Sequence, residues 1–259
     1  MSVAAETVRL ERRGAVAAIT IDRPEARNAL TGEMRAELLG IFERLADDPD
    51  LRVVTLRGAG GKTFISGADI KEFAARRSAA DVVAQARRDE QLYQAIERLP
   101  APVIAVIEGY AIGGGLMLAA ICDLRICTSD SRFGVTSAKS LGNCLSPGMY
   151  ARLAALIGAG RLKELLILSE LIPAETAREW GLVTEVVERA DLDARVGALC
   201  EQLSGHAPLT MWAAKESVRR LVAGYPDEED ILERVHASED FHEGVDAFLE
   251  KRAPRWRNR

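Results

Sequence analysis

Residues 102–117 constrain this chain more than any other segment. They begin with a short β-branched apolar run, residues 103–107, that predicts a buried strand. Gly109 ends the run, and three glycines at 113–115 open a second apolar segment, residues 116–122, whose composition favours a helix. A strand that enters a helix through glycines leaves backbone N–H groups and the positive end of the helix dipole directed at one place. That place suits an anion, or an oxygen that becomes one during a reaction.

Length and composition exclude several classes of protein. With 259 residues the chain can bury a full core, as one large domain or one domain with a lobe. Its net charge of −5 gives no electrostatic case for nucleic acid or an acidic membrane surface. The longest apolar stretch, residues 111–122, is shorter than the roughly 20 residues that a membrane span needs. Four cysteines without paired spacing, and no charged-then-apolar leader, predict reduced thiols in a cytoplasmic protein.

The hydrophobic pattern predicts an α/β part of roughly 190 residues followed by a helical tail. Strands are expected at residues 8–10, 16–21, 52–57, 103–107, 124–127, 133–135 and 182–187, with a hairpin turn at 12–14. Helices are expected at residues 31–46, 81–99, 116–122, 147–156, 161–168, 174–180, 192–203, 209–222 and 227–249.

Two nucleotide-binding motifs are excluded by the residues around them. Gly61-Lys62-Thr63 resembles the end of a phosphate-binding P-loop, but Leu56 stands where that motif requires glycine. The three glycines at 113–115 do not have the Gly-x-Gly-x-x-Gly spacing of dinucleotide sites. The three histidines lie among charged residues of the tail, so we interpret them as solvated and predict no metal site: His206, His236 and His242.

A second strand-to-helix turn strengthens the case for an oxygen-binding site. In Ser66-Gly67-Ala68-Asp69-Ile70-Lys71-Glu72 a glycine stands directly before Ala68 and offers another backbone N–H at a helix start. Two such donors that converge on one oxygen would form an oxyanion hole. Glycines that only permit close strand–helix packing are the alternative interpretation.

These motifs resemble those of the crotonase (enoyl-CoA hydratase/isomerase) superfamily. The resemblance covers nearly the whole chain and rests on ordered segments at residues 23–30, 66–72, 102–115, 122–123, 133–134, 179–183 and 243–252. It implies an α/β fold, a spiral of repeated ββα units at residues 1–190. It also implies a C-terminal helical trimerisation region at 191–259, with self-association as a homotrimer or a hexamer.

The resemblance also implies a substrate and a site. The substrate would be an acyl-CoA thioester, so that coenzyme A is part of the substrate and no separate cofactor is expected. The thioester carbonyl would lie between the backbone N–H groups of Ala68 and Gly114. The other implied substrate contacts are Ser66, Asp69 and Ile70 on the nucleotide side, and Arg27 and Lys71 at the phosphates. Phe248 and Lys251 would contact the adenine from a neighbouring subunit.

The chain departs from the family pattern at the two glutamates that hydratases use to add water. The first position is Met117, and the second is Ser137, or Ala138 when counted back from Leu141 and Gly142. Methionine exchanges no proton, and serine is a poor base without a partner. The loss of a general acid or base costs about 10²–10⁴-fold in rate. We therefore predict that hydration by the two-glutamate route is weak or absent.

The sequence leaves the reaction open. A thioester enolate in the oxyanion hole would serve isomerisation, decarboxylation, carbon–carbon cleavage or hydrolysis. A relocated proton carrier would be one of five side chains for which a structural role is the alternative: Asp69, Glu108, Lys139, Cys144 and Tyr150. The competing hypothesis is a non-catalytic acyl-CoA-binding or assembly subunit, and a nucleotide-binding module is a third, disfavoured by Leu56.

Overall fold

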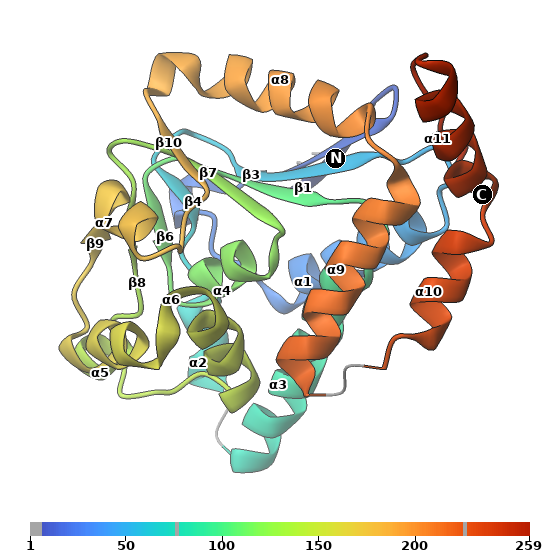
Figure 1. The fold of residues 1–259 in the computed structure, drawn as a ribbon. Coiled ribbons are helices and arrows are strands. Elements are labelled where there is room, and N and C mark those ends of the chain that lie inside the picture. Colours follow the sequence, from blue (N-terminus) through green and yellow to red (C-terminus); the bar gives the residue numbers. More distant parts are fainter. Residues whose placement is uncertain (1–6, 76–77, 225–226) are drawn as a thin grey trace, which may run out of the picture.

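Two β-sheets form the centre of the fold in the computed structural model, which describes residues 7–75, 78–224 and 227–259 (Figure 1). Within that part of the chain, the larger sheet has the strand order β1-β2-β3-β5-β7-β10, and only its first pair is antiparallel. The smaller sheet has the order β4-β6-β8-β9, with β9 antiparallel. The strands outside the repeat described next are β1 (Val8–Arg13), β2 (Val16–Ile21), β9 (Ile172–Pro173) and β10 (Glu185–Val187).

The middle of the chain repeats one order of elements. Each repeat places its first strand in the larger sheet, its second strand in the smaller sheet, and then a helix. The repeats are β3 (Val53–Gly58), β4 (Thr63–Ile65) and α2 (Ile70–Ala75); β5 (Val103–Ile107), β6 (Tyr110–Ile112) and α4 (Gly114–Ile121); and β7 (Leu124–Thr128), β8 (Arg132–Gly134) and α5 (Ser137–Ser140). The expected ββα repeat is therefore confirmed.

Side chains of the larger sheet alternate between two cores. In β5, Ala105 and Ile107 join the main core with α1 (Gly32–Ala46) and α3 (Ala79–Arg98), whereas Ile104 and Val106 face the other way. There they pack against α8 (Leu192–Ser204), which lies above the larger sheet at the top of Figure 1. Because both faces are covered, this strand is an unbroken apolar run.

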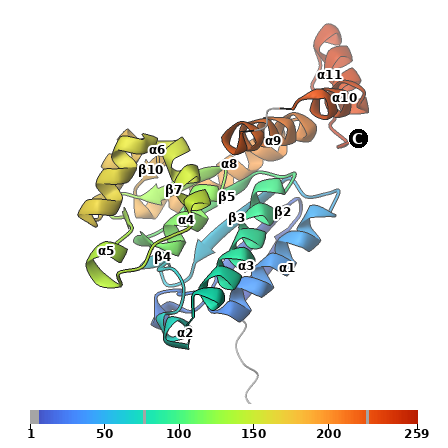
Figure 2. The ribbon, with the colours of Figure 1, turned by 90° about the horizontal axis from the view of Figure 1, so that it is seen from below.

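The remaining helices follow in the second half of the chain. They are α6 (Pro147–Leu168), α7 (Ala174–Glu179), α9 (Pro208–Ala223), α10 (Glu229–His236) and α11 (Glu239–Glu250). Of these, α6 and α7 contribute residues to the main core. Lys215 anchors α9, because its ammonium group lies 2.7 Å from the Asp123 carboxylate and donates to the Ala101 carbonyl. Beyond α9, α10 and α11 project from the body (Figure 2). None of the helices in the described residues has the length and apolar character that crossing a membrane requires.

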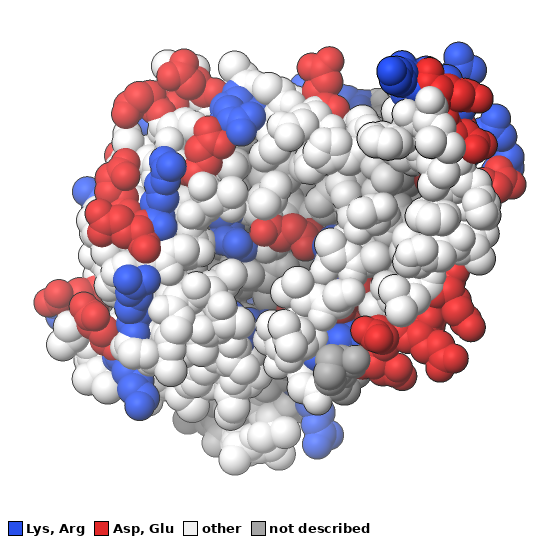
Figure 3. Space-filling view, in the orientation of Figure 1, with Lys and Arg blue, Asp and Glu red and all other residues white. Residues whose placement is uncertain are grey.

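On the face shown in Figure 3, charged side chains of both signs lie mainly toward the edges. Basic and acidic side chains are interspersed around uncharged areas, and acidic side chains gather near α10. The residues around the start of α10 include Asp227, Glu228, Glu229 and Asp230. The described residues form no continuous basic area on this face.

Several expected element boundaries were wrong. The helix expected at 227–249 is two helices, because the Ser238 hydroxyl donates to Val235 O, accepts from Phe241 N and so starts α11 as its N-cap. The late strand covers only Glu185–Val187, because the amides of Leu182 and Val183 donate back to Ala177 at the end of α7. The hairpin turn consists of Gly14 and Ala15 rather than residues 12–14, because β1 continues to Arg13 and pairs there with Val16.

The glycine segment is more structured than its sequence indicates. Tyr110–Ile112 forms strand β6, which the sequence does not predict, and α4 begins at Gly114 rather than at Leu116. Strand β8 ends at Gly134, one residue before the expected end. The helices expected at 147–156 and 161–168 form one element, α6, which bends at Gly158 with φ 78° and ψ 153°.

Candidate functional site

The backbone N–H of Ala68 is free to bind a ligand. Leu30 N donates to Gly67 O at 2.8 Å, and Asp69 N donates to Leu30 O at 2.9 Å, in a bridge between the two segments. Because successive N–H groups of an extended chain point to opposite sides, that of Ala68 points away from Leu30. Among the described residues it donates to no other backbone group.

The start of α4 supplies a second donor beside the first. The first hydrogen bond of this helix runs from Met117 N to Gly113 O at 3.1 Å, so the N–H of Gly114 precedes the helical ladder. A Cβ atom added to Gly114 would lie 3.4 Å from Gly67 Cα and 3.7 Å from Ala68 N. The two strand-to-helix turns that the sequence singled out are thus in contact.

Two glycines make this contact possible for different reasons. Gly113 has φ 55° and ψ −121°, a backbone conformation that residues with a Cβ rarely adopt. Gly115 lies so close to β4 that an added Cβ would overlap the Ile65 carbonyl. The packing of α4 on β4 therefore sets the separation of the Ala68 and Gly114 amides.

A deep cleft opens over these two amides. It has a volume of about 730 Å³ and we call it the main cleft. Cavities of this size hold organic ligands in other proteins. Its wall contains residues 25–27, 66–71 and 112–114, one face of α3, and part of the segment from Thr136 to Met149.

Arg23, Arg27 and Asn28 form a rigid loop at the cleft rim. Asn28 is fully buried and its side-chain amide donates to Ala59 O and Thr63 O, while its carbonyl accepts from Arg23 N. Arg27 and Asn28 both have left-handed backbone angles, with φ 54° and 55°. This anchoring holds the Arg27 side chain at the cleft wall.

Asp69 is a constrained carboxylate rather than an open base. Arg23 Nη1 donates to it at 2.6 Å, and Lys71 N donates at 3.0 Å. The hydrogen bond from Arg23, and then that from Lys71 N, lower the pKa of Asp69 below its ordinary value. The carboxylate therefore joins the loop at residue 23 to the start of α2.

Asp69→Asn is expected to lower the free energy of unfolding near neutral pH. It should also weaken the decrease of that free energy as the solution becomes acidic. Because the folded-state pKa is lowered, the stabilisation is present above the unfolded-state pKa and is lost as pH falls through the folded-state value. Urea denaturation of both proteins from pH 7 to pH 3 measures this. The stability difference should shrink toward pH 3, whereas exposed Asp246→Asn should give no such trend. A constant difference would contradict the assignment.

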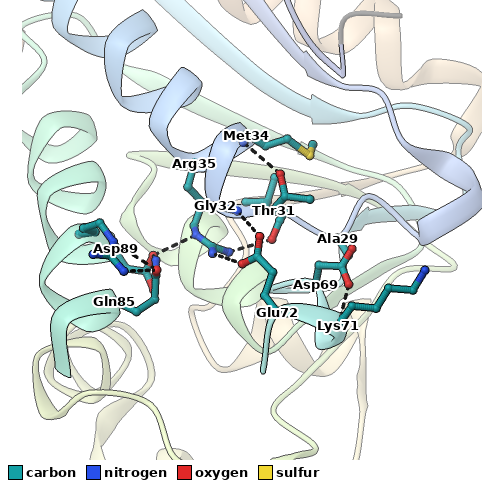
Figure 4. A network of polar contacts seen from close by, with 12 residues as sticks. Ala29, Thr31, Gly32, Met34, Arg35, Asp69, Lys71, Glu72, Gln85 and Asp89 are labelled. Carbon is teal, nitrogen blue, oxygen red and sulfur yellow. Dashed lines mark hydrogen bonds and ion pairs between the residues drawn. The ribbon is translucent and has the colours of Figure 1, made fainter. Parts of the chain in front are cut away.

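A polar network forms the wall between α1, α2 and α3 (Figure 4). Buried Arg35 donates to Leu30 O and to Glu72, which in turn accepts from Gly32 N. Arg35 Nε lies 3.1 Å from Asp89 Oδ1 but is not aligned for a hydrogen bond. Gln85 donates to the same carboxylate oxygen at 2.7 Å. One guanidinium thus faces two carboxylates.

The structure brings most predicted site residues together. The main cleft is lined by Arg27, Ser66, Ala68, Asp69, Ile70, Lys71, Gly114 and Ser137. Met117 is fully buried in the main core and is not part of the cleft wall, which the next residue, Leu118, reaches instead. Phe248 is 84% exposed at the end of α11, where Lys251 is the C-cap, and both lie away from this cleft.

Comparison with known proteins identifies the family. The sequence profile of the enoyl-CoA hydratase/isomerase family matches residues 11–259. This chain belongs to that family. It is 38% identical over 256 residues to (E)-benzylidenesuccinyl-CoA hydratase of Thauera aromatica, a match that covers 96% of this chain and 98% of the relative. It is 36% identical to the carnitinyl-CoA dehydratase of Escherichia coli, with 98% and 99% of the two chains covered.

Solved structures of the family show the same fold. An enoyl-CoA hydratase/carnithine racemase from Magnetospirillum magneticum superposes with a TM-score of 0.90 at 34% identity, covering 98% of this chain and 96% of that one. The crotonase-like α/β fold expected from the sequence is therefore confirmed.

Three of the five proposed proton carriers are hydrogen-bonded to other groups of the protein or lie outside the cleft wall. Glu108 accepts from Arg57 at 2.8 Å and from Arg189 at 2.7 Å. The Tyr150 hydroxyl accepts from Leu145 N, and Lys139 is not among the cleft-lining residues. Asp69 and exposed Cys144 do line the cleft.

Sequence reasoning missed the contribution of α3. Its cleft-lining residues follow helical spacing: Val82, Gln85, Ala86, Asp89, Leu92 and Tyr93. The spacing was visible in the sequence, but this face mixes apolar and polar side chains and so does not differ from an ordinary half-buried helix. Only its place opposite Ala68 and Gly114 marks it as part of the site.

Proposed function

We propose that this protein binds an acyl-CoA thioester in the main cleft and stabilises its enolate. The observation that carries the proposal is the contact between two strand-to-helix turns, which places the N–H groups of Ala68 and Gly114 side by side in one cleft. Two preorganised N–H donors on one carbonyl oxygen stabilise negative charge that develops there. The thioester oxygen would accept from both amides, and the positive end of α4 adds to the stabilisation.

The CoA phosphates would lie at the rim of the main cleft. Arg27 and Lys71 line the wall there, and Lys71 is exposed. Ser66, Asp69 and Ile70 would contact the nucleotide side. Phe248 and Lys251 would reach the adenine only from a neighbouring subunit, because both lie away from this chain's own cleft.

Lys71→Ala is expected to weaken binding of CoA thioesters about two- to fivefold at low ionic strength. An exposed ammonium group attracts phosphate through solvent, so the effect should shrink as salt is added. Isothermal titration at two salt concentrations measures it. Lys163→Ala, an exposed change on α6 outside the cleft, should have no effect. Equal losses for both variants would contradict the phosphate contact.

The reaction would differ from hydration by two glutamates. No acid stands at residue 117 or 137, and the Met117 side chain is buried in the core. An enolate held by two amides serves isomerisation, decarboxylation or carbon–carbon cleavage, provided that a proton carrier reaches the acyl chain. In hydrolysis the same two amides would instead hold the oxyanion formed when water adds to the thioester carbonyl. We propose a lyase or isomerase reaction of this kind.

A panel of acyl-CoAs analysed by mass spectrometry tests this function. The panel contains saturated, enoyl, malonyl-type and β-keto thioesters, which cover the four reaction types. We expect the protein to convert one of these classes to product. Turnover of crotonyl-CoA at a rate typical of hydratases, unchanged in Ser137→Ala, would contradict the proposed chemistry.

A non-catalytic acyl-CoA-binding or assembly subunit is the second candidate. Buried Met117 favours it, because this position carries no group that exchanges protons. Binding without any product across the whole panel would favour the binder over the enzyme.

We also propose that the protein is a cytoplasmic homotrimer or hexamer. An apolar groove with Phe241, Val245, Phe248, Leu249 and Trp256 in its wall lies on the projecting C-terminal helices. Exposed apolar patches of this kind mark protein–protein contacts. Light scattering coupled to size exclusion would give the oligomeric state, and a monomer would contradict the proposal.

A further inference from the structure

Two peptide groups connect the side chain of Arg23 with the amide of Ala68. Arg23 Nη1 donates to Ala29 O at 3.1 Å. That oxygen shares a peptide group with Leu30 N, which donates to Gly67 O at 2.8 Å. Gly67 O in turn shares a peptide group with Ala68 N, whose N–H faces the main cleft. We call these two hydrogen-bonded peptide groups the peptide relay.

Such a relay both directs and strengthens its last donor. Because a peptide group is planar and trans, the hydrogen bond that Gly67 O accepts determines where the N–H of Ala68 points. Hydrogen bonds in series also polarise one another, by about 10–30% per bond. Since the first donor, Arg23, is a cation, the N–H at the far end becomes a stronger donor than that of an isolated amide.

Asp69 holds the guanidinium at the start of the relay. Arg23 Nη1 lies 2.6 Å from Asp69 Oδ2, with 21% of the Arg23 side chain and 13% of the Asp69 side chain exposed. Asp69 N donates to Leu30 O at 2.9 Å, so Leu30 also fixes the peptide group on the other side of Ala68. The ion pair therefore ties together the two segments that meet in the bridge between Leu30 and Ala68.

The two donors of the site differ in what lies behind them. The peptide group that carries the Gly114 N–H accepts from Met117 N, a neutral backbone donor, at 3.1 Å. The peptide group that carries the Ala68 N–H has a guanidinium behind it. Arg23 also pairs with the Asp69 carboxylate, which would otherwise stand one residue from Ala68 as an unpaired charge and oppose an oxyanion.

We propose that Arg23 is a positioning residue that directs and polarises the N–H of Ala68 through the peptide relay. The inference rests on the proposed function, in which that N–H binds the thioester oxygen. Arg23 lies in the cleft wall, so direct contact with the CoA phosphates is the competing role. A phosphate contact would act on every CoA ligand, whereas the relay acts on the thioester carbonyl alone.

Calorimetric titration with butyryl-CoA and S-butyl-CoA, the thioether that lacks the carbonyl oxygen, separates the two roles. Both ligands contain the whole CoA part, so the ratio of their affinities measures the carbonyl contacts. The wild-type protein should bind butyryl-CoA about 5- to 30-fold more tightly, as expected for two hydrogen bonds. Arg23→Met should lower this ratio about two- to tenfold and leave S-butyl-CoA affinity unchanged. Arg23→Lys keeps the charge and a donor nitrogen and should restore most of the ratio.

The carbonyl stretching frequency of bound butyryl-CoA gives a second readout, which a loss of stability alone would not change. Hydrogen bonds to the carbonyl oxygen lower this frequency. Infrared difference spectra should show a smaller decrease on binding to Arg23→Met than on binding to the wild-type protein. An equal decrease in both proteins would contradict polarisation through the relay.

The matched control is Arg195→Met on α8, because Arg195 pairs with Glu185 at 2.8 Å outside the cleft wall. This variant should keep the wild-type ratio. If Arg23→Met does not fold, Asp69→Asn decides, because it keeps the side-chain shape and weakens the ion pair; the ratio should fall about twofold.

The outcomes separate the inference from the proposed function. An unchanged ratio in the folded variants, including an equal loss of both ligands, would overturn the role of Arg23 and leave the proposed function intact. Equal affinity of the wild-type protein for the two ligands, or no binding of either, would overturn both. Mass spectrometry confirms that each ligand is intact after titration.

Discussion

Arg125→Met is expected to destabilise the protein by about 3–5 kcal/mol, because it leaves several buried carbonyl groups without donors at a cost of about 1–3 kcal/mol each. The Arg125 side chain is buried and donates to the backbone carbonyls of Ala119, Ala120, Cys122, Asp123 and Leu182. The first four of these carbonyls lie at or just beyond the end of α4, where a helix has no partners for its last carbonyl groups.

The guanidinium of Arg125 therefore acts as a buried C-terminal cap for the helix whose first residue is Gly114. Methionine fills a similar volume but leaves these carbonyls without donors in a site that water does not reach. Equilibrium urea denaturation measures the loss. The matched control is Arg132→Met in β8, whose guanidinium donates, within the described residues, to just the neighbouring Asp130 and Ser131 carbonyls. A loss of about 0.5 kcal/mol is expected there. Similar losses at both positions would refute the capping role.

Gly115→Ala is expected to cost about 3 kcal/mol and to impair CoA thioester binding. An alanine Cβ there would overlap the Ile65 carbonyl, which belongs to the backbone of β4 and cannot rotate away. To relieve the overlap α4 must shift from β4, and this shift separates the Ala68 and Gly114 amides. Urea denaturation and calorimetric titration with butyryl-CoA measure the two effects.

A second glycine provides a control of opposite sign. Gly197 lies inside α8, and apart from the backbone of that helix no atom of the described residues lies within 4 Å of an added Cβ. Gly197→Ala should stabilise the protein by about 0.5–1 kcal/mol, because alanine loses less backbone entropy in a helix. If Gly115→Ala were as stable as Gly197→Ala, close packing of α4 on β4 would not set the geometry of the site.

Local patterns in the sequence were enough for the strands of the larger sheet and for both strand-to-helix turns. The apolar run at Val103–Ile107 and the glycines that follow it depend on interactions between near neighbours, which a sequence displays directly. The same holds for residues 66–72, where Gly67 precedes the free amide of Ala68. The break at Ser238 was missed because a serine N-cap inside a continuous helical pattern is a weak signal beside the apolar periodicity around it.

The chain by itself determined the two turns, the family and the absence of acids at residues 117 and 137. Only the tertiary structure decided which surfaces meet. In the sequence Arg125 is an ordinary strand residue, and only the fold brings it to the end of α4. Tyr93 is likewise an ordinary helix residue in the sequence, and only the fold places it in the same cleft as Gly114. Helical and strand periodicity identify the face that a residue occupies, but the partner of that face comes from contacts between residues distant in the chain.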